Sequence, residues 1–234
     1  MNDVRGFTLV ELILGMAITA IIGLCVYNMF WSGVKLDDKM RHVHDNYMEV
    51  LMADQAMTHD LENAINLDFS GSYPDAVVFD GQKTEFSCLT QTSKGIKKVR
   101  YFSGLKDGLA EKSMIGRVVN PSSSSNGSKE PLPVEFLIRQ ESSMGDWLNE
   151  TTDNTTTQIV AAGFEKGSFN CQYAAFDKDL HNSGEKAIDY KETWDSKGLP
   201  MSVSCSFVLY DAKNSKTGTM FKRDMFLAPL TNTK

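Results

Sequence analysis

Residues 6–34 read GFTLVELILGMAITAIIGLCVYNMFWSGV, and Glu11 is the one charged side chain among them. No charge interrupts the 23 residues from Leu12 to Val34. As an α-helix these residues would extend over about 35 Å, whereas the hydrocarbon core of a bilayer is about 30 Å thick. The stretch therefore predicts a helix that is long enough to cross a membrane.

The chain as a whole is mildly hydrophilic, and its averages hide this segment. Its 234 residues carry 24 Lys and Arg against 30 Asp and Glu, and the mean hydropathy is −0.27. That mean excludes a polytopic membrane protein, and the length suits one domain, or one domain plus an appendage. The net charge of −6 argues against nucleic acid as a partner, because phosphate binding needs clustered Lys and Arg.

An ordinary signal peptide or signal anchor is the simplest alternative for the N-terminus. A secretory signal places a cationic region before a short apolar core, and a small-residue cleavage site follows that core. Here the apolar stretch is longer, and the candidate processing site, Gly6-Phe7, precedes it. A plain anchor also leaves Glu11 unexplained, since a carboxylate in an apolar helix is costly and usually marks function or a partner.

The run Arg5-Gly-Phe-Thr-Leu-Val-Glu-Leu12, followed directly by a long apolar helix, resembles the class III signal of type IV pilins and type II secretion pseudopilins. The resemblance implies that a prepilin peptidase cleaves after Gly6 and N-methylates the new terminal residue, Phe7. It also implies that Glu11 becomes the fifth mature residue and serves in assembly. There it would form a salt bridge with the Phe7 ammonium of a neighbouring subunit, which favours subunits in register.

A one-sided pattern follows Val34, and no proline occurs before Pro74. Apolar residues recur at heptad-like spacing at Leu36, Met40, Val43, Tyr47, Val50, Met57, Leu61 and Ala64. The opposite side carries Asp37, Lys39, His42, Asp45, Glu49, Asp60 and Glu62. This amphipathic stripe predicts that the helix continues to about Leu67 and packs on a sheet. A coiled coil fits less well, because the stripe is short and lacks a steady Ile/Leu pattern.

From residue 68 onward, period-two alternation predicts short antiparallel strands. The expected strands are Val77–Phe79, Thr84–Thr90, Lys97–Ser103, Val134–Gln140, Gln158–Ala162, Ser168–Ala174, Met201–Tyr210 and Thr219–Leu227. Residues 211–218 form a polar turn that joins the last two strands. Two polar segments, residues 120–133 and 149–157, have the composition of exposed loops.

These patterns predict an α+β chain in four parts: a leader at 1–6, a membrane-spanning or filament-core helix at 7–34, its amphipathic half at 35–67 and a β-rich domain at 68–234. The resembled family has this architecture, the pilin-like fold, in which a long N-terminal helix packs on an antiparallel sheet. Shorter stretches resemble the J-type minor pseudopilins, namely Asp60–Glu62, Lys97–Phe102, Gly198–Pro200 and Met225–Pro229. The segment from about 104 to 197 carries no resemblance.

No motif for catalysis is present: H-E-x-x-H, G-x-S-x-G, a P-loop and C-x-x-C are all missing, so we expect no enzymatic activity and no cofactor. His42 and His44 diverge on the predicted helix, which argues against a shared metal. The acidic segment 177–195 raises the question of calcium, but its spacing does not match an EF-hand, and a solvated surface is favoured.

Four cysteines are present, and Cys25 lies in the apolar span. The others, Cys88, Cys171 and Cys205, allow three disulfide pairings. Cys205 and Cys88 are also compatible with buried small apolar residues, so the pairing stays open.

The resemblance implies a minor pseudopilin of a type II secretion system, a tip or initiation subunit that supports protein export across the outer membrane. Such a protein spans the inner membrane once, with a cytoplasmic leader and a periplasmic C-terminal domain. Its partners would be the lipid bilayer, the prepilin peptidase, the assembly platform, the major pseudopilin and the other minor pseudopilins. A minor type IV pilin, acting in adhesion or DNA uptake, shares the N-terminus and remains an alternative. So does a membrane-tethered enzyme or receptor.

Overall fold

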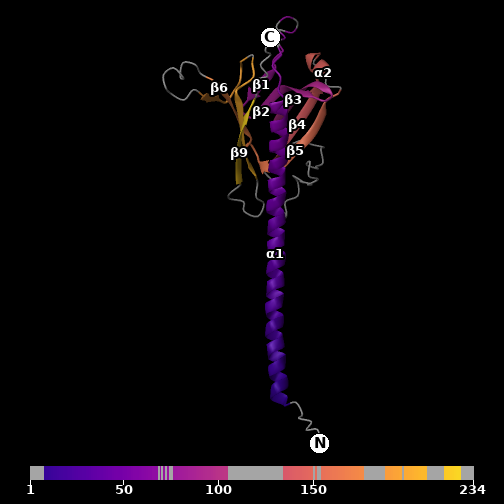
Figure 1. Cartoon of the computed structure of the whole chain (residues 1–234), viewed down its shortest axis with the longest axis vertical. Helices are drawn as coiled ribbons and strands as arrows, with labels where there is room; N and C mark the ends of the chain where they lie inside the picture. The colour runs from indigo at the N-terminus through magenta and orange to yellow at the C-terminus, as the bar shows by residue number, and fades with distance from the viewer. Residues whose placement is uncertain are drawn as a thin grey trace. The chain divides into compact units, whose positions relative to one another are not determined.

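The computed structural model describes residues 8–67, 69, 71, 73, 76–104, 134–149, 151, 154–176, 188–196, 198–209 and 219–227. It divides the chain into two units, Met1–Tyr47 and Met48–Lys234. Helix α1 (Leu9–Glu62) contributes to both, and the second unit contains an antiparallel sheet (Figure 1). The predicted α+β class, with a long apolar N-terminal helix and an antiparallel sheet domain, is confirmed.

The described strands form one nine-stranded sheet. They are β1 (Phe79–Gln82), β2 (Glu85–Thr92), β3 (Gly95–Gly104), β4 (Val134–Ser143), β5 (Thr156–Glu165), β6 (Asn170–Phe176), β7 (Ile188–Lys191), β8 (Ser202–Leu209) and β9 (Thr219–Phe226). The order is β1-β2-β3-β4-β5-β8-β6-β7, and β9 lies outside this path and pairs with β8. Strands β1 to β5 thus form a meander, and β6 to β9 form a second group.

The second group of strands folds back against the start of the meander. The Cys171 amide donates to the Lys83 carbonyl (2.7 Å), and the Trp194 amide donates to the Gly81 carbonyl (2.8 Å). The Tyr173 hydroxyl donates at 2.6 Å to the carbonyl of Gln82, the residue between these two acceptors. A Cβ atom at Gly81 would lie 2.6 Å from Cζ of Tyr173, so this close approach requires glycine.

Each expected strand overlaps an observed one, and β3, β4 and β5 extend further than predicted. The first differs most, because β1 begins at Phe79, where the expected strand ended. Strand β7 was not predicted, although Ile188 and Tyr190 alternate with polar residues, because the stretch is only four residues long and lies in a segment that the acidic composition assigned to a solvated surface. The short helix α2 (Met144–Leu148) was also missed. The predicted leader, the loop 120–133 and the turn 211–218 lie outside the described residues.

Helix α1 ends at Glu62, five residues before the predicted end at Leu67. The Asn63 side chain donates at 2.7 Å to the His59 carbonyl, which belongs to the last turn of the helix. The chain then runs along β2, where the Ile65 amide donates to the Leu89 carbonyl (2.9 Å). These hydrogen bonds with the edge of the sheet replace the helical ones, which explains the earlier end.

The part of α1 within the second unit packs through small and medium apolar side chains. Ala53, Met57 and Leu61 are buried and belong to the main core. Sheet residues of that core include Phe86, Val99, Tyr101, Leu137, Val160, Phe164, Tyr173, Val203 and Phe207. Each buried Leu or Met of this kind contributes roughly 1.5–3 kcal/mol of transfer free energy. The stripe predicted from the sequence therefore packs on the sheet in its C-terminal half.

The N-terminal half of the predicted stripe is different. Leu36, Met40 and Tyr47, all in the first unit, are exposed, with exposed fractions of 58%, 62% and 63%. The side chain of Val43 lies outside the described residues. These positions therefore supply no intramolecular core contact in the described chain.

Two carboxylates that the sequence pattern assigned to the polar side of the helix are in fact buried. Glu49 is fully buried and Asp60 is 2% exposed. The prediction was wrong because Glu49 precedes Ala53 by four residues and Asp60 follows Met57 by three. Both therefore lie on the packed face by helical geometry.

Glu49 contacts the sheet at an irregular point of β5. Its Oε2 accepts a hydrogen bond from the Ala162 amide at 3.0 Å. The β4–β5 register shifts on either side of Ala162, and Gly163 adopts a φ of +82°. Bulges leave backbone groups without a ladder partner, and here a helix carboxylate supplies one.

Asp60 lies at the centre of a polar network between α1, β3 and β4. Its carboxylate accepts from Arg139 through Nε (2.7 Å) and Nη2 (3.2 Å), a bidentate pair. The Tyr101 hydroxyl donates to the same carboxylate at 2.6 Å. Arg139 also donates to Glu141 at 2.6 Å. Burial, and then the negative charge of Asp60, raises the pKa of Tyr101 well above its ordinary value of 10.0.

Glu49→Ala should destabilise the second unit. It removes the acceptor of a buried amide, and such a loss costs about 1–3 kcal/mol. Glu49→Gln keeps an acceptor oxygen and should cost less. Urea unfolding of the purified chain in detergent, followed by circular dichroism, measures both. Glu62→Ala is the control because Glu62 is exposed on the same helix. Equal stability of Glu49→Ala and Glu62→Ala would contradict the role given to Glu49.

The raised pKa of Tyr101 predicts a loss of stability at alkaline pH. The folded chain keeps this proton while the unfolded chain releases it near pH 10.0. The stabilisation is therefore complete below about pH 10 and is lost as the pH rises further, by about 1.4 kcal/mol per pH unit. Tyr101→Phe should remove this part of the slope, whereas Tyr190→Phe, at an exposed position, should not. Urea unfolding at a series of pH values compares them, and equal slopes for wild type and Tyr101→Phe would refute the prediction.

Candidate assembly site

The N-terminus of α1 is closed by a reciprocal pair of polar contacts. The Thr8 amide and hydroxyl donate to Oε2 of Glu11 at 3.0 and 2.9 Å, and the Glu11 amide donates to the Thr8 hydroxyl at 3.4 Å. This is a capping box, which satisfies helix donors that would otherwise lack a partner. The carboxylate also lies at the positive end of the helix dipole. Glu11 thus has a structural role within its own subunit.

This role of Glu11 was not predicted, although the signal was present. Thr8 and Glu11 are three residues apart and precede an apolar run, which is the capping-box spacing. Both contacts to the carboxylate within the described residues use Oε2. The predicted cleavage residue Gly6 and methylated residue Phe7 lie outside the described residues.

The helix that follows Glu11 is apolar on all sides. The segment Leu9–Arg41 is long and apolar enough to cross a membrane. Its large apolar side chains are exposed, from 44% at Val34 to 79% at Met29. The Cβ positions of Gly15, Gly23 and Gly33 are open, with no atom within 4 Å. The surface fits a single-pass membrane anchor, since a helix that is apolar all round requires lipid or other helices around it.

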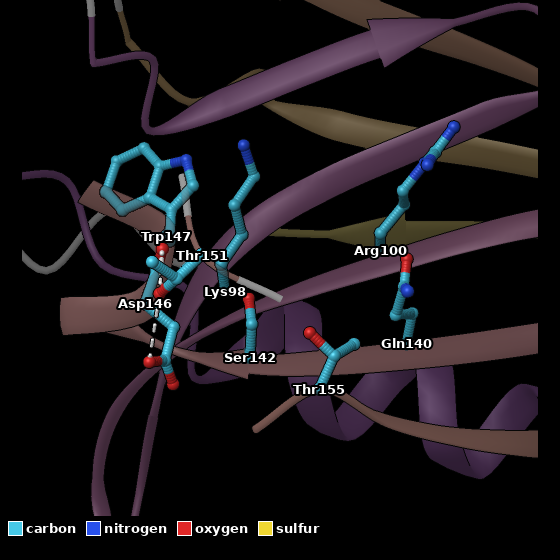
Figure 2. A pocket seen from close by; sticks show the side chains of 8 residues that line it. All are labelled: Lys98, Arg100, Gln140, Ser142, Asp146, Trp147, Thr151 and Thr155. Carbon is cyan, nitrogen blue, oxygen red and sulfur yellow. Dashed lines mark hydrogen bonds between the residues drawn. The ribbon is translucent and has the colours of Figure 1, made fainter. Parts of the chain in front are cut away.

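A pocket of about 300 Å³ with mostly polar lining residues opens beside β3 and β4 (Figure 2). Lys98 and Arg100 alternate with Tyr101 along β3, so they lie on the opposite face of the strand. It is lined by Lys98, Arg100, Gln140, Ser142, Asp146, Trp147, Thr151 and Thr155. The Lys98 ammonium lies 4.8 Å from the centroid of the Trp147 ring, and burial lowers the pKa of Lys98. Figure 2 shows the Lys98 ammonium directed away from Ser142, so the two do not form a nucleophile and base. The lining therefore combines two basic side chains with the carboxylate of Asp146 and the hydroxyl groups of Ser142, Thr151 and Thr155.

A second pocket, of about 320 Å³, borders the network around Asp60. His59 lines it, and its Nδ1 lies 3.6 Å from Asp60 Oδ1. The Asp60 carboxylate already accepts hydrogen bonds from Tyr101 and Arg139. These contacts commit it to holding the helix on the sheet, so the pair does not resemble a catalytic His–Asp unit.

Within the described part of the chain, no three His, Cys, Asp or Glu side chains are placed to hold a metal ion. Much of the acidic segment considered for calcium, residues 177–187, lies outside the described residues. Of the remainder, Glu192 forms an ion pair with Lys83 at 2.8 Å. The side chain of His42 is not described, and His44 is exposed.

All four cysteines are described, and all carry free thiols. Cys25 is exposed within the apolar span, and Cys88, Cys171 and Cys205 are buried. Cys171 and Cys205 lie opposite each other on β6 and β8, with their sulfur atoms 3.3 Å apart. Of the three pairings that the sequence allowed, the structure places this pair in contact.

Comparison with known proteins gives one match. Residues 1–25 match the family model described as the prokaryotic N-terminal methylation motif. No curated protein and no solved structure gives a significant match. The motif supports the type IV pilin and pseudopilin class and implies processing by a prepilin peptidase and assembly with other pilin-like subunits. It does not distinguish J-type pseudopilins from other members. The chain therefore carries a prepilin-type methylation motif at the head of a pilin-like α+β fold.

Proposed function

We propose that this chain is a minor pseudopilin of a type II secretion system, which acts at the tip or in the initiation of the pseudopilus. In this proposal the leader is cytoplasmic, the helix crosses the inner membrane and the sheet domain is periplasmic. The observation that carries the proposal is the combination of a methylation motif with a carboxylate on an exposed apolar helix. The J-type resemblance of the short stretches in the sheet domain favours secretion over a pilus.

The mechanism in this proposal is binding. The apolar surface of Leu9–Val34 is covered by lipid before assembly and by neighbouring helices in the filament. Oε2 of Glu11 caps its own helix, and the second oxygen accepts the Phe7 ammonium of a neighbour. A carboxylate among apolar helices is costly unless it is paired, so the pair selects one axial register between subunits.

The predicted maturation can be tested directly. In a host with a prepilin peptidase, the purified chain should start at Phe7 and carry one methyl group on its terminal amine. Intact-mass measurement should show the loss of the six leader residues and the gain of one methyl group. In a peptidase-deficient host the mass should be that of the full chain. An intact Met1 start in the competent host would refute the proposed maturation.

Variants of Glu11 and Thr8 separate capping from intersubunit pairing. Glu11→Gln keeps the cap, since glutamine also serves in a capping box, but removes the charge. We expect Glu11→Gln and Glu11→Ala both to lose incorporation into the filament by at least about tenfold, as expected when an ion pair in low dielectric is broken. Thr8→Ala weakens the cap, keeps the charge and should assemble. Crosslinking to neighbouring subunits in membranes measures incorporation, and mass measurement verifies processing in each variant.

Two outcomes would count against the proposal, one in this experiment and one in a strain from which the gene is deleted. Full incorporation of Glu11→Gln would show that Glu11 acts as a helix cap alone. Loss of piliation without loss of exoprotein secretion in a deletion strain would identify a minor type IV pilin instead. Asn28→Ala, a second polar-to-apolar change in the same helix, controls for general effects on insertion.

A further inference from the structure

The strands β6 and β8 place two cysteines directly opposite each other. Cys171 and Cys205 are register partners in this antiparallel pair, and both are fully buried. Their side chains face the main core together with Tyr173 and Phe207. The sulfur atoms are 3.3 Å apart, which is contact distance for two thiols.

The two residues form a non-hydrogen-bonded pair of the ladder. The Cys171 amide donates to the Lys83 carbonyl at 2.7 Å and thus turns away from β8. On β8, the Val208 amide donates to the Ser168 hydroxyl at 3.1 Å, so the backbone N–H and C=O groups of even-numbered residues point towards β6. The backbone groups of Cys205 therefore point towards β9. In such pairs the Cα atoms are about 4.5 Å apart, within the range of about 4.4–6.8 Å that disulfides span. A bond between these sulfur atoms therefore requires side-chain rotation and no rearrangement of the backbone.

The remaining cysteines lack such a partner. Cys88 lies between Phe79 and Val99 in the register of β1, β2 and β3. Cys25 lies in the apolar span of the first unit. The cross-strand geometry thus singles out one pairing among the four cysteines of the chain.

We propose that Cys171 and Cys205 form a disulfide in the mature chain, made by thiol–disulfide exchange with a disulfide-bearing oxidant of the cell envelope. The thiolate of one cysteine attacks the oxidant and forms a mixed disulfide. The thiolate of the other attacks the protein sulfur and releases the oxidant as a dithiol. The two cysteines lose two protons and two electrons, and the oxidant gains them. The exposure to this oxidant rests on the proposed periplasmic location.

The burial of the pair sets the time of the reaction. Both sulfur atoms are inaccessible in the folded domain, and burial raises the pKa of Cys205 well above its ordinary value. Exchange requires a thiolate and access to the oxidant, so the bond forms before β6 and β8 close over it. Once formed, it would connect residues 34 positions apart and enclose β7.

The pairing can be read by alkylation and mass spectrometry. The full chain is produced in an envelope-competent host, quenched in acid, denatured and treated with N-ethylmaleimide without reductant. The wild type should take up two labels, on Cys25 and Cys88, and should take up four after reduction. Cys171→Ser should take up three labels without reductant, because Cys205 is released. Cys88→Ser should take up one label and keep the linked peptides.

A second measurement separates the pairing from the location. The reduced full chain is refolded in detergent with oxidised glutathione, which supplies the oxidant in vitro. The bridge should form there, and its reduction should lower the midpoint of thermal unfolding by about 10 °C, as expected for a loop of this size. The double variant Cys171→Ser/Cys205→Ser should show no response to reductant.

The outcomes test separately the Cys171–Cys205 pairing and the periplasmic location on which its formation in the cell rests. Four labels on the wild type from cells together with no effect of reductant on the refolded chain, or a bridge that includes Cys88, would overturn the pairing. A bridge in vitro without one in cells would overturn the disulfide of the mature chain and count against the periplasmic location. Two labels in cells together with a mature Phe7 terminus would support both.

Discussion

The ion pair between Asp60 and Arg139 determines how α1 lies on the sheet. Two charges that are largely removed from water are tolerated only when they meet with good geometry, and here Tyr101 completes the coordination of the carboxylate. Glu49 adds a second polar contact eleven residues earlier, about 16 Å along the same face. A shift of the helix by one residue would rotate both carboxylates by about 100° and remove them from these hydrogen-bond partners. The apolar core supplies most of the free energy, while these contacts specify one rotation and one register.

The sequence predicted the class of fold because the two periodicities are clear. The apolar run after Glu11 and the alternation in segments such as Val203–Leu209 correspond to α1 and β8 in the structure. The prediction failed where side-chain type was taken as a guide to position. Glu49 and Asp60 were placed in solvent because they are charged, although their spacing from Ala53 and Met57 places them on the packed face. Strand β7 alternates apolar and polar residues over only four positions, all of them exposed, and its pairing with β6 is a long-range contact that so short a pattern does not establish.

The candidate site shows the same division between local and long-range information. The importance of Glu11 was visible because a lone carboxylate interrupts an apolar run. Its capping contact with Thr8 is local as well and follows from a known spacing. The approach of Cys171 to Cys205 depends on the pairing of β6 with β8, two strands that are separated along the chain by β7. Register between distant strands is set by the whole core, so the sequence left three pairings open and the fold selects one.

Four glycines within the described residues differ in what a side chain would meet, and this difference bears on which positions tolerate change. Gly81 is held by its own domain, because any side chain there would collide with the Tyr173 ring. Gly15, Gly23 and Gly33 face open space, so nothing within the described subunit prevents a larger residue there. Selection for folding alone would keep Gly81 and let the three helix glycines drift. Retention of those three among natural variants would therefore record the close approach of other molecules to the helix, and their pattern around it would mark the sides on which neighbours pack.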